Sequence, residues 1–337
     1  MHGGVMATHT PELFGSPLPS ISVILPVLNE EAHIESAINS ILSQDYLGRF
    51  EVILAIGPSH DRTLEIAQEL SRKDPRVVLV DSPSGRTAAG LNLALAKSES
   101  PVVVRVDGHA HIPNNYLSLV IEILSKTGAV NVGGVMAAVG TTPFESAVAG
   151  AMRSPLGVGA SRFHTGGEAG EVDTVYLGAF RREALLAIGG FDERFTRAQD
   201  WELNFRLREN GGIVYFDPRL HVTYRPRSSV RALAKQYFEY GRWRRVVSRR
   251  HSGTINLRYL APPFALVGFT LSLIAGFFNP LLFIPAAIYI LFVLGASVAI
   301  ASSIREYFLL LAVIPTMHFA WGAGFISSPK TLVPTSD

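Results

Sequence analysis

Short apolar segments alternate with segments of helical periodicity over the first third of the chain. We expect buried strands over residues 21–28, 50–56, 77–80 and 102–106. The segments between them carry apolar residues at helical spacing, which predicts helices over residues 30–42, 63–70 and 87–97. Strands and helices that alternate in this way predict crossover connections and a parallel sheet of the α/β class.

The pattern loosens after about residue 133. Residues 141–173 are rich in Gly, Ser, Ala and Pro, and we interpret them as a mobile substrate loop or a covering segment. Further on, the pattern predicts helices over residues 182–188 and 200–209, each followed by a glycine pair, and a strand over residues 213–216. Residues 230–250 then form a basic amphipathic pattern.

Three long apolar segments end the chain, at residues 260–278, 281–302 and 307–326. Each is close to the roughly 20 residues that cross a bilayer. Buried core helices are the alternative, but three such segments with almost no internal charge suit lipid better. The arginines before the first segment predict a cytoplasmic N-terminal part, and three spans would then put the C-terminus outside. These arginines are Arg242, Arg244, Arg245, Arg249, Arg250 and Arg258.

Composition changes this picture little. Hydrophobic residues make up 48% of the 337 residues, with the excess after about residue 257, and a net charge of +2 gives no indication of nucleic acid as a partner. The absence of cysteine excludes disulfides, thiolate metal sites and cysteine nucleophiles. The first 20 residues lack the basic start and apolar core of a secretory signal, so we interpret them as a loose tail.

The most informative carboxylate ends the fourth strand, in the stretch VVVRVDGHAHI. Ligands of parallel sheets bind beyond the carboxyl ends of the strands, so Asp107 should face a binding crevice. A carboxylate there can ligate Mg²⁺ or Mn²⁺, and the ion can bridge a diphosphate. His109 could supply a second ligand. The alternative is that Asp107 only caps a strand-to-loop turn.

Polar residues after the other strands should face the same crevice. Asn29 and Glu30, in the stretch PVLNE, and Asp61 could hydrogen-bond a base or a ribose, or could only cap helices. Arg86, in PSGRTAAGLN, offers a guanidinium to phosphate beside a helix start. That stretch is neither a Walker A loop nor a dinucleotide fingerprint.

Two further clusters could carry chemistry. Asp200, in QDWE at a helix start, should have its pKa lowered by the helix dipole and could accept a proton from a hydroxyl, although a capping role is the alternative. For Glu202 we expect a surface salt bridge. The stretch QYFEYGRW contains Gln236, Arg242 and Trp243. Its aromatic residues are typical of a membrane interface, and its arginines could bind a diphosphate. The alternative is that these residues serve only packing and membrane anchoring.

Each motif is weak alone, but their order resembles that of the family 2 glycosyltransferases over residues 21–243. The matching stretches are PVLNE, S-x-D-x-T, GRTAAGLN, V-D-G-H, GGFDE and QDWELNFRL. The DGH variant and the YGRW stretch are most similar to the membrane-attached, succinoglycan-type exopolysaccharide glucosyltransferases.

This resemblance implies a GT-A fold at residues 21–229, with a Rossmann-like mixed, mostly parallel sheet flanked by helices, and inverting transfer from a nucleotide-diphosphate sugar. It also implies roles for single residues. Pro26, Asn29 and Glu30 would line the nucleotide pocket beside Asp61, Asp107 would be the first acid of the D-x-D metal motif, Asp200 would be the general base, and Gln236, Arg242 and Trp243 would stand near the Q-x-x-R-W motif. An interfacial helix at residues 230–256, membrane helices at 257–327 and a tail at 328–337 would complete the chain.

Four departures from the family pattern matter. Ile56 and Gly57 stand where many relatives have two acids, which leaves the nucleotide base open. His109 replaces the second acid of D-x-D, and Gln199 replaces the Glu that precedes the base. Gln236 and Arg242 are six residues apart instead of three, which argues against processive polymer synthesis.

The sequence therefore predicts a multi-pass inner-membrane enzyme of cell-envelope or exopolysaccharide synthesis. We expect a UDP-sugar as donor and a lipid-linked saccharide as acceptor. Two alternatives remain open: a polyprenyl-phosphate glycosyltransferase, and a catalytically silent sugar-nucleotide-binding scaffold at the membrane.

Overall fold

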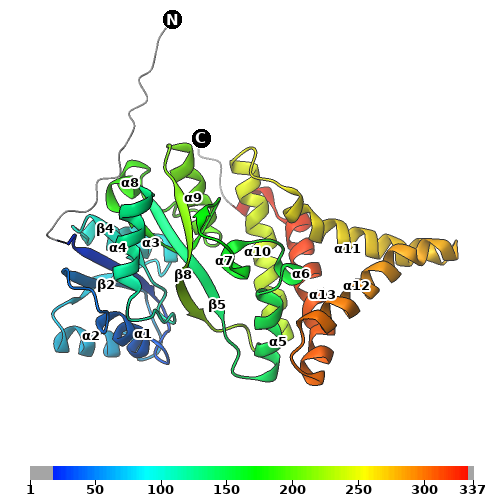
Figure 1. Cartoon of the computed structure of the whole chain (residues 1–337), viewed down its shortest axis with the longest axis horizontal. Helices are drawn as coiled ribbons and strands as arrows, with labels where there is room; N and C mark the ends of the chain where they lie inside the picture. Colours follow the sequence, from blue (N-terminus) through cyan, green and yellow to red (C-terminus); the bar gives the residue numbers. More distant parts are fainter. Residues whose placement is uncertain (1–17, 333–337) are drawn as a thin grey trace, which may run out of the picture. The chain divides into compact units, whose positions relative to one another are not determined.

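The computed structural model describes residues 18–332 and contains a mixed eight-stranded sheet in the order β3-β2-β1-β4-β7-β5-β8-β6 (Figure 1). Its first half is parallel, with β1 between β2 and β4 and with β3 beside β2. These strands are β1 (Ile21–Val27), β2 (Phe50–Ile56), β3 (Val77–Asp81) and β4 (Val102–Arg105). The predicted α/β class and its four leading strands are confirmed.

In the second half of the sheet, three pairings are antiparallel: β4 with β7, β5 with β7, and β6 with β8. The strands are β5 (Asn131–Ala138), β6 (Gly170–Glu171), β7 (Tyr176–Arg181) and β8 (Val214–Tyr224). The sequence pattern did not predict β5 or β7, and it made β8 too short. In β5, Gly133 and Gly134 interrupt the apolar alternation that would have indicated a strand. Larger residues do not fit at these two positions, because Val175 and the backbone of Leu220 lie against them.

The helices of this part begin and end close to where the pattern predicts, with two exceptions. Helix α1 starts four residues late, because residues 31–33 form a turn, and α4 was not predicted. Helix α3 lies close to the sheet at Gly90, where an added Cβ would approach Ala55 and Pro26 to 3.3 and 3.5 Å. The helices are α1 (Ile34–Leu42), α2 (Thr63–Lys73), α3 (Thr87–Lys97), α4 (Tyr116–Thr127), α8 (Arg182–Ala187) and α9 (Gln199–Glu209).

Residues 141–173 contain three short helices and a short strand rather than an irregular loop: α5 (Pro143–Met152), α6 (Pro155–Val158), α7 (Arg162–Thr165) and β6. Thr142 and Glu145 form a capping box at the start of α5, and Pro143 occupies its first turn. The expectation of a mobile loop is therefore wrong for α5, since a capped helix with buried side chains needs a fixed position.

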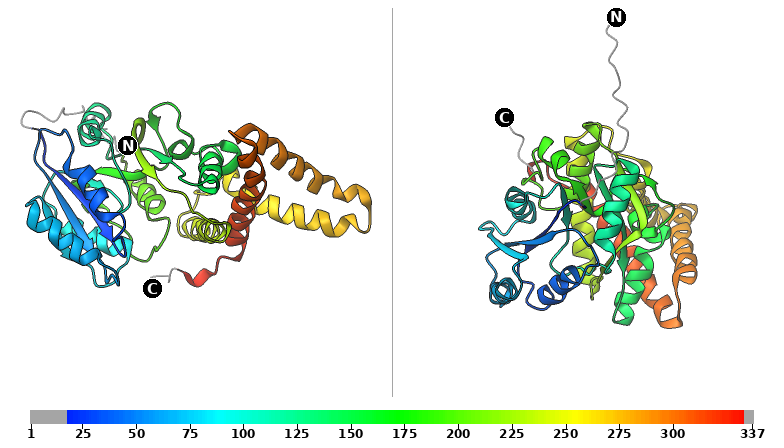
Figure 2. Two further views of the ribbon diagram at one scale, coloured as in Figure 1. Left: turned by 90° about the horizontal axis from the view of Figure 1, so that it is seen from below. Right: turned by 60° about the vertical axis from the view of Figure 1, so that its left-hand side comes forward.

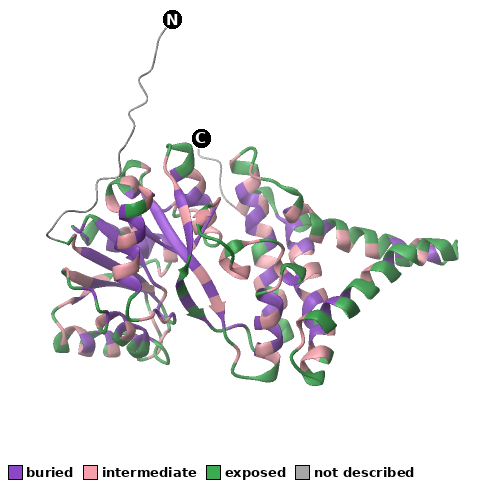
Figure 3. Ribbon diagram, viewed as in Figure 1, coloured by how far each residue is buried: buried purple, intermediate pink, exposed green. Residues whose placement is uncertain are grey.

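Long helices make up the rest of the chain: α10 (Val230–Arg250), α11 (Leu257–Gly276), α12 (Ile284–Ile300) and α13 (Ile304–Ser327), with short 3₁₀ turns η1 (Pro280–Phe283) and η2 (Lys330–Leu332). Three segments are long and apolar enough to cross a membrane: Leu257–Gly276, Pro280–Ile300 and Ile304–Ser327. Figure 3 shows that the sheet strands are largely buried while α11 and α12 expose much of their length.

The chain divides into two compact units. Unit 1 comprises residues up to Val135, Glu168–Glu193 and Asp200–Val222, and unit 2 comprises Met136–Gly167, Arg194–Gln199 and the residues from Thr223 onward. The core of unit 1 lies on both faces of the sheet, because alternate strand residues such as Val23 and Ile24 pack into different clusters.

Candidate functional site

The loops that follow β1 and β2 are joined by hydrogen bonds at the carboxyl edge of the sheet. The backbone N–H of Asn29 donates to Oγ of Ser59 at 3.0 Å, and the backbone N–H of His60 donates to Oδ1 of Asn29 at 2.9 Å. Asn29 has φ +54°, a left-handed conformation that asparagine tolerates better than most residues. The turn explains why an asparagine stands at this position.

Asp61 organises the same pair of loops. Its Oδ2 accepts the backbone N–H of Glu31 at 3.1 Å, and its Oδ1 accepts both the hydroxyl of Thr63 at 2.5 Å and the backbone N–H of Thr63 at 3.1 Å. These bonds, led by the threonine hydroxyl, lower the pKa of Asp61. The carboxylate is ionised at neutral pH, and its oxygens shape the loops that would face a nucleotide.

Gly57 and Gly85 lie close together in the loops after β2 and β3. A Cβ added at Gly57 would lie 3.1 Å from Cα of Gly85 and 3.1 Å from Leu28. This packing leaves little room for a side chain at position 57. Arg86, one residue further on, is exposed at the start of α3, and Pro26 is half-buried in β1.

Two carboxylates from distant parts of the chain meet at one buried guanidinium. Arg105, the last residue of β4, is 6% exposed. Its Nε and Nη2 donate to Oδ1 of Asp107 at 3.2 and 3.0 Å, and its Nη1 donates to Oδ1 of Asp200 at 2.5 Å. The predicted metal ligand and the predicted base are therefore brought together, 93 positions apart in sequence.

The electrostatics of this cluster differ from the expectation for Asp200. Burial raises the pKa of Asp200, the nearby Asp107 charge adds to that effect, and Arg105 opposes it. The predicted lowering by the helix dipole is wrong, because desolvation outweighs a dipole effect that is confined to the helix terminus. Burial alone would lower the pKa of Arg105, but Asp107 and Asp200 raise it above its usual value.

Glu202 was expected in a surface salt bridge, yet it is only 1% exposed. Its two oxygens accept Nε and Nη2 of Arg206 at 2.6 and 2.7 Å, one turn along α9. Arg206 also donates to the carbonyl of Ile188 at 2.7 Å. The ion pair exists, but it is a buried connection between α9 and the turn after α8.

His109 is exposed, and its Nδ1 lies 2.8 Å from Oε1 of Glu30. Such a carboxylate–imidazole contact fixes the ring orientation and the tautomer of a histidine, as it does around metal-bound histidines. The pair joins the loop after β4 to the loop after β1, so both predicted residues lie at the same edge of the sheet.

The donor atoms around Asp107 suit a hard divalent cation that takes only a few of its ligands from the protein. Within residues 18–332, no group of three or more His, Asp or Glu side chains could hold a metal ion. Both bonds from Arg105 end on Oδ1 of Asp107, which leaves Oδ2 for a cation. Mg²⁺ is commonly held by one or two carboxylates together with substrate phosphates and water, so the residues fit a cation that a diphosphate would complete.

The remaining predicted residues lie in unit 2. Gln236 donates through Nε2 to the hydroxyls of Tyr224 and Tyr240 at 2.7 and 2.8 Å. Arg242 pairs with Glu239 at 2.8 Å. Trp243 is 3% exposed and packs on Phe195, so its position is that of a core residue.

Arg105 is the residue that the sequence pattern missed. The signal was present, since a charged residue interrupts the apolar run Val102–Val106. A long cation in a strand that is otherwise fully buried requires acidic partners. The sequence alone could not identify both acidic partners, because Asp200 lies on α9, far from Arg105 along the chain.

The chain is similar in sequence and in fold to known proteins. The profile of glycosyl transferase family 2 matches residues 22–189. The chain is 33% identical to the succinoglycan biosynthesis protein ExoA of Rhizobium meliloti (strain 1021), over 90% of this chain and 93% of that protein. It is 25% identical, over 85% of its length and 89% of the relative, to the dolichyl N-acetyl-alpha-D-glucosaminyl phosphate 3-beta-D-2,3-diacetamido-2,3-dideoxy-beta-D-glucuronosyltransferase of Methanococcus voltae.

Among solved structures, the fold is similar to that of the mannosyltransferase PcManGT from Pyrobaculum calidifontis, which was determined in complex with GDP-Man and Mn²⁺. The TM-score is 0.59 at 20% identity, and the match covers 92% of this chain and 87% of the other. At this identity the likeness establishes the fold alone.

Proposed function

Since the chain belongs to glycosyl transferase family 2, we propose that it transfers a sugar from a nucleotide-diphosphate sugar to a lipid-linked saccharide, with inversion at the anomeric carbon. The observation that carries this proposal is the meeting of Asp107 and Asp200 on Arg105. One acid would hold the donor's diphosphate through a cation, and the other would take the proton of the acceptor.

In the proposed reaction the acceptor hydroxyl oxygen forms a bond to C1 of the sugar while the bond from C1 to the diphosphate oxygen breaks. The hydroxyl proton passes to Asp200, and the nucleoside diphosphate leaves with the bond electrons. Mg²⁺ or Mn²⁺, held by Asp107 and His109, would neutralise the charge on the leaving group. The raised pKa of Asp200 favours this role, because a base with a higher pKa accepts a proton more readily.

The loops after β1, β2 and β3 form the proposed nucleotide pocket. Asn29, Glu30 and Asp61 lie in the joined loops, and Pro26 lies in β1 where they begin. The exposed guanidinium of Arg86 is available to a phosphate. A UDP-sugar remains the expected donor, although Ile56 and Gly57 stand where the family pattern has the two acids proposed to recognise the base.

The candidate membrane helices and the names of two relatives support a lipid-linked saccharide as the acceptor. One relative takes part in succinoglycan biosynthesis, and another is named for transfer to a dolichyl-linked sugar phosphate. The candidate membrane helices would hold the enzyme at the inner membrane with unit 1 in the cytoplasm, where nucleotide sugars are available. A saccharide on a lipid carrier is the acceptor class that suits this location, and Gln236 and Arg242 are candidates for its binding.

The test uses the full chain in nanodiscs. Nucleotide sugars are first screened by thermal shift with and without Mn²⁺, because a ligand that binds the native state raises its apparent stability. The best donor is then incubated with lipid-linked saccharides and, separately, with polyprenyl phosphate, and the product is analysed for phosphate content and anomeric configuration. Transfer to a sugar hydroxyl with inversion supports the proposal. Transfer only to the phosphate indicates the polyprenyl-phosphate alternative, and donor binding without transfer indicates a silent scaffold.

A further inference from the structure

Helices α11 and α12 form an antiparallel hairpin within unit 2. Oγ of Ser272 donates to the carbonyl of Leu282 at 2.5 Å and accepts the backbone N–H of Ala286 at 3.0 Å, which ties the two helices near the tip. At the tip, Phe277 and Phe278 are 85% and 87% exposed. Figure 1 and the left view of Figure 2 show the two helices extending together away from α10 and α13.

Helix α13 packs along α10, and its middle also contacts the hairpin, where Gly322 lies against the backbone of Pro262 and the ring of Phe319 stacks on Tyr289. Gly241 of α10 lies against the backbone of Trp321, and Gly324 of α13 lies against the backbone of Phe238, so small residues bring the two helices into close contact. The guanidinium of Arg245 stacks 5.0 Å from the ring of Phe325. Figures 1 and 2 show α13 crossing the base of the hairpin.

The C-terminal end of α13 is bonded to the arginine-rich end of α10. Nη2 and Nη1 of Arg249 donate to the carbonyls of Ser328 and Pro329 at 2.8 and 3.1 Å, and Oγ of Ser328 donates to the carbonyl of Arg242 at 3.0 Å. The arginines of α10 stand directly before α11 and belong on the cytoplasmic side. The end of α13 therefore lies on that side as well.

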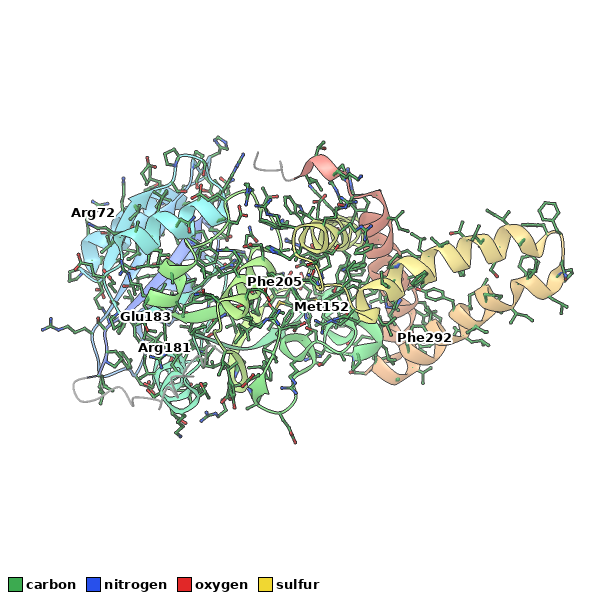
Figure 4. All side chains as sticks on the ribbon, turned by 90° about the horizontal axis from the view of Figure 1, so that it is seen from above. Arg72, Met152, Arg181, Glu183, Phe205 and Phe292 are labelled. Carbon is green, nitrogen blue, oxygen red and sulfur yellow. The ribbon has the colours of Figure 1, made fainter. Side chains whose placement is uncertain are left out.

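The middle of α13 also contacts α6, a segment that does not belong in hydrocarbon. Nε2 of His318 lies 3.1 Å from the carbonyl of Leu156 in α6, and its Nδ1 lies 3.2 Å from the hydroxyl of Tyr289. Phe292 of α12, labelled in Figure 4, lies 6.0 Å from the same ring. The short α6 is flanked by irregular backbone and by Arg153 and Arg162, and such a segment is not stable against lipid.

The start of α13 is close to the same elements. Ile300, the last residue of α12, lies 3.0 Å from the Cβ position of Gly150 in α5. Helix α12 thus returns to the level of α5, and α13 begins only four residues later. The C-terminal end and the middle of α13 are consequently bound to parts of unit 2 outside the hairpin, and its start follows α12 near α5, although its 24 residues would be long enough to cross a bilayer.

From these contacts we infer that only the α11–α12 hairpin crosses the membrane, and that α13 lies beside α10 at the cytoplasmic interface. The hairpin is long enough, because 20 residues of α11 rise about 30 Å, the thickness of the hydrocarbon core. The number of crossings is then two. The C-terminus lies on the cytoplasmic side, opposite to the side that three spans would give.

The chain contains no cysteine, so single cysteines can report the topology directly. Four variants are made at exposed positions: Ser252→Cys after α10, Phe278→Cys at the hairpin tip, Ser302→Cys between α12 and α13, and Thr331→Cys after α13. Each full-length variant is treated with a membrane-impermeant maleimide in intact cells and in inverted membrane vesicles, with detergent-solubilised protein as the measure of full labelling.

We expect Phe278→Cys to be labelled only from outside, and the other three variants only in inverted vesicles. External labelling of Thr331→Cys together with internal labelling of Ser302→Cys would establish a third span and overturn the inference. Internal labelling of Phe278→Cys would overturn it too, since the hairpin would then not cross. None of these outcomes depends on catalysis, so they test the topology independently of the proposed function.

Discussion

Units 1 and 2 differ sharply in charge. Unit 1, over its described residues, carries 23 Asp and Glu against 14 Lys and Arg, whereas the described part of unit 2 carries 3 acidic residues against 16 basic ones. The near-neutral whole chain conceals this contrast. Unit 1 uses its acids in the loops after the strands, and unit 2 gathers arginines next to long apolar helices.

Each unit has the charge that its expected partner requires. A site that holds a divalent cation needs carboxylates, and it can hold a diphosphate only through that cation or through well-placed arginines. A surface at the cytoplasmic face of a membrane gains from arginine, because anionic lipids attract it. The contrast therefore predicts that substitutions of Asp107 and Asp200 in unit 1 affect chemistry, while substitutions in unit 2 affect packing and membrane association.

The strongest test of the chemical side is Asp200→Asn. Loss of the base should lower kcat by about 10²- to 10⁴-fold, the usual contribution of a positioned general base. Donor affinity should change little, because Asp200 is not among the residues proposed to hold the nucleotide. Transfer rates and donor binding are measured on the same preparation.

Glu209→Gln is the matched control, since Glu209 lies at the exposed end of the same helix. This variant should keep full activity. If Asp200→Asn retained normal turnover, the base would have to be another residue, and the meeting of the two acids would be structural.

A second test removes the guanidinium that joins the two acids. Arg105→Gln leaves Asp107 and Asp200 near each other without a counter-charge, and breaking a buried ion pair in this way costs about 3–5 kcal/mol of unfolding free energy. The pKa of Asp200 should rise further, because the guanidinium that opposes its elevation is gone. The acidic limb of the kcat/KM profile should therefore move to higher pH.

A purely structural role for Arg105 would lower stability and active fraction at every pH without moving that limb. Arg105→Lys separates charge from geometry: it keeps a cation but loses the fork that reaches both acids. An unshifted limb in Arg105→Gln would contradict the positioning role.

The sequence predicted the parallel half of the sheet because its strands are uninterrupted apolar runs bounded by turn residues. It also predicted that Asp107 and Asp200 matter, but it could not bring them together, since Asp107 lies just after β4 and Asp200 lies on α9. The missed α5 was readable in part: TTPFE contains a capping box with proline at the first helical position. The composition of the surrounding segment obscured that signal.

Membrane helices illustrate another limit. Length and hydropathy identify α13 as a candidate span, yet they carry no information about what lies beside a helix. The contacts of Arg249 with Ser328 and Pro329 supply that information, and they arise only in the folded chain.

In unit 2, substitution of Trp243 tests whether this residue binds a substrate or only packs in the core. Its indole is 3% exposed and packs 5.8 Å from the ring of Phe195. Trp243→Ala should lower the unfolding free energy by about 3–5 kcal/mol, as other large-to-small core changes do. Trp243→Phe should recover most of this loss, together with activity. A Trp243→Ala protein with unchanged thermal stability and lost acceptor use would instead place the ring in a substrate site.

The smallest expected effect concerns Glu145, one of the three described acids of unit 2. Its side chain accepts the hydroxyl of Thr141 at 2.6 Å and closes the capping box of α5, and Arg225 lies 3.2 Å away. These partners, led by the threonine hydroxyl, lower the pKa of Glu145 to about 2. A carboxyl with a depressed native pKa stabilises the fold above its unfolded pKa, so this contribution should fade as the pH falls from about 4.5 toward 2.

Glu145→Gln should therefore cost about 1 kcal/mol at neutral pH, in the range of other cap substitutions. The difference from the wild type should narrow below pH 4, which thermal unfolding at several pH values can measure. Transfer activity should not change, because the residue serves packing. A constant difference across that pH range would mean that the carboxylate charge contributes nothing. Lost activity in a fully stable variant would mean that the acids of unit 2 share the chemistry of unit 1, and the contrast between the units would fail.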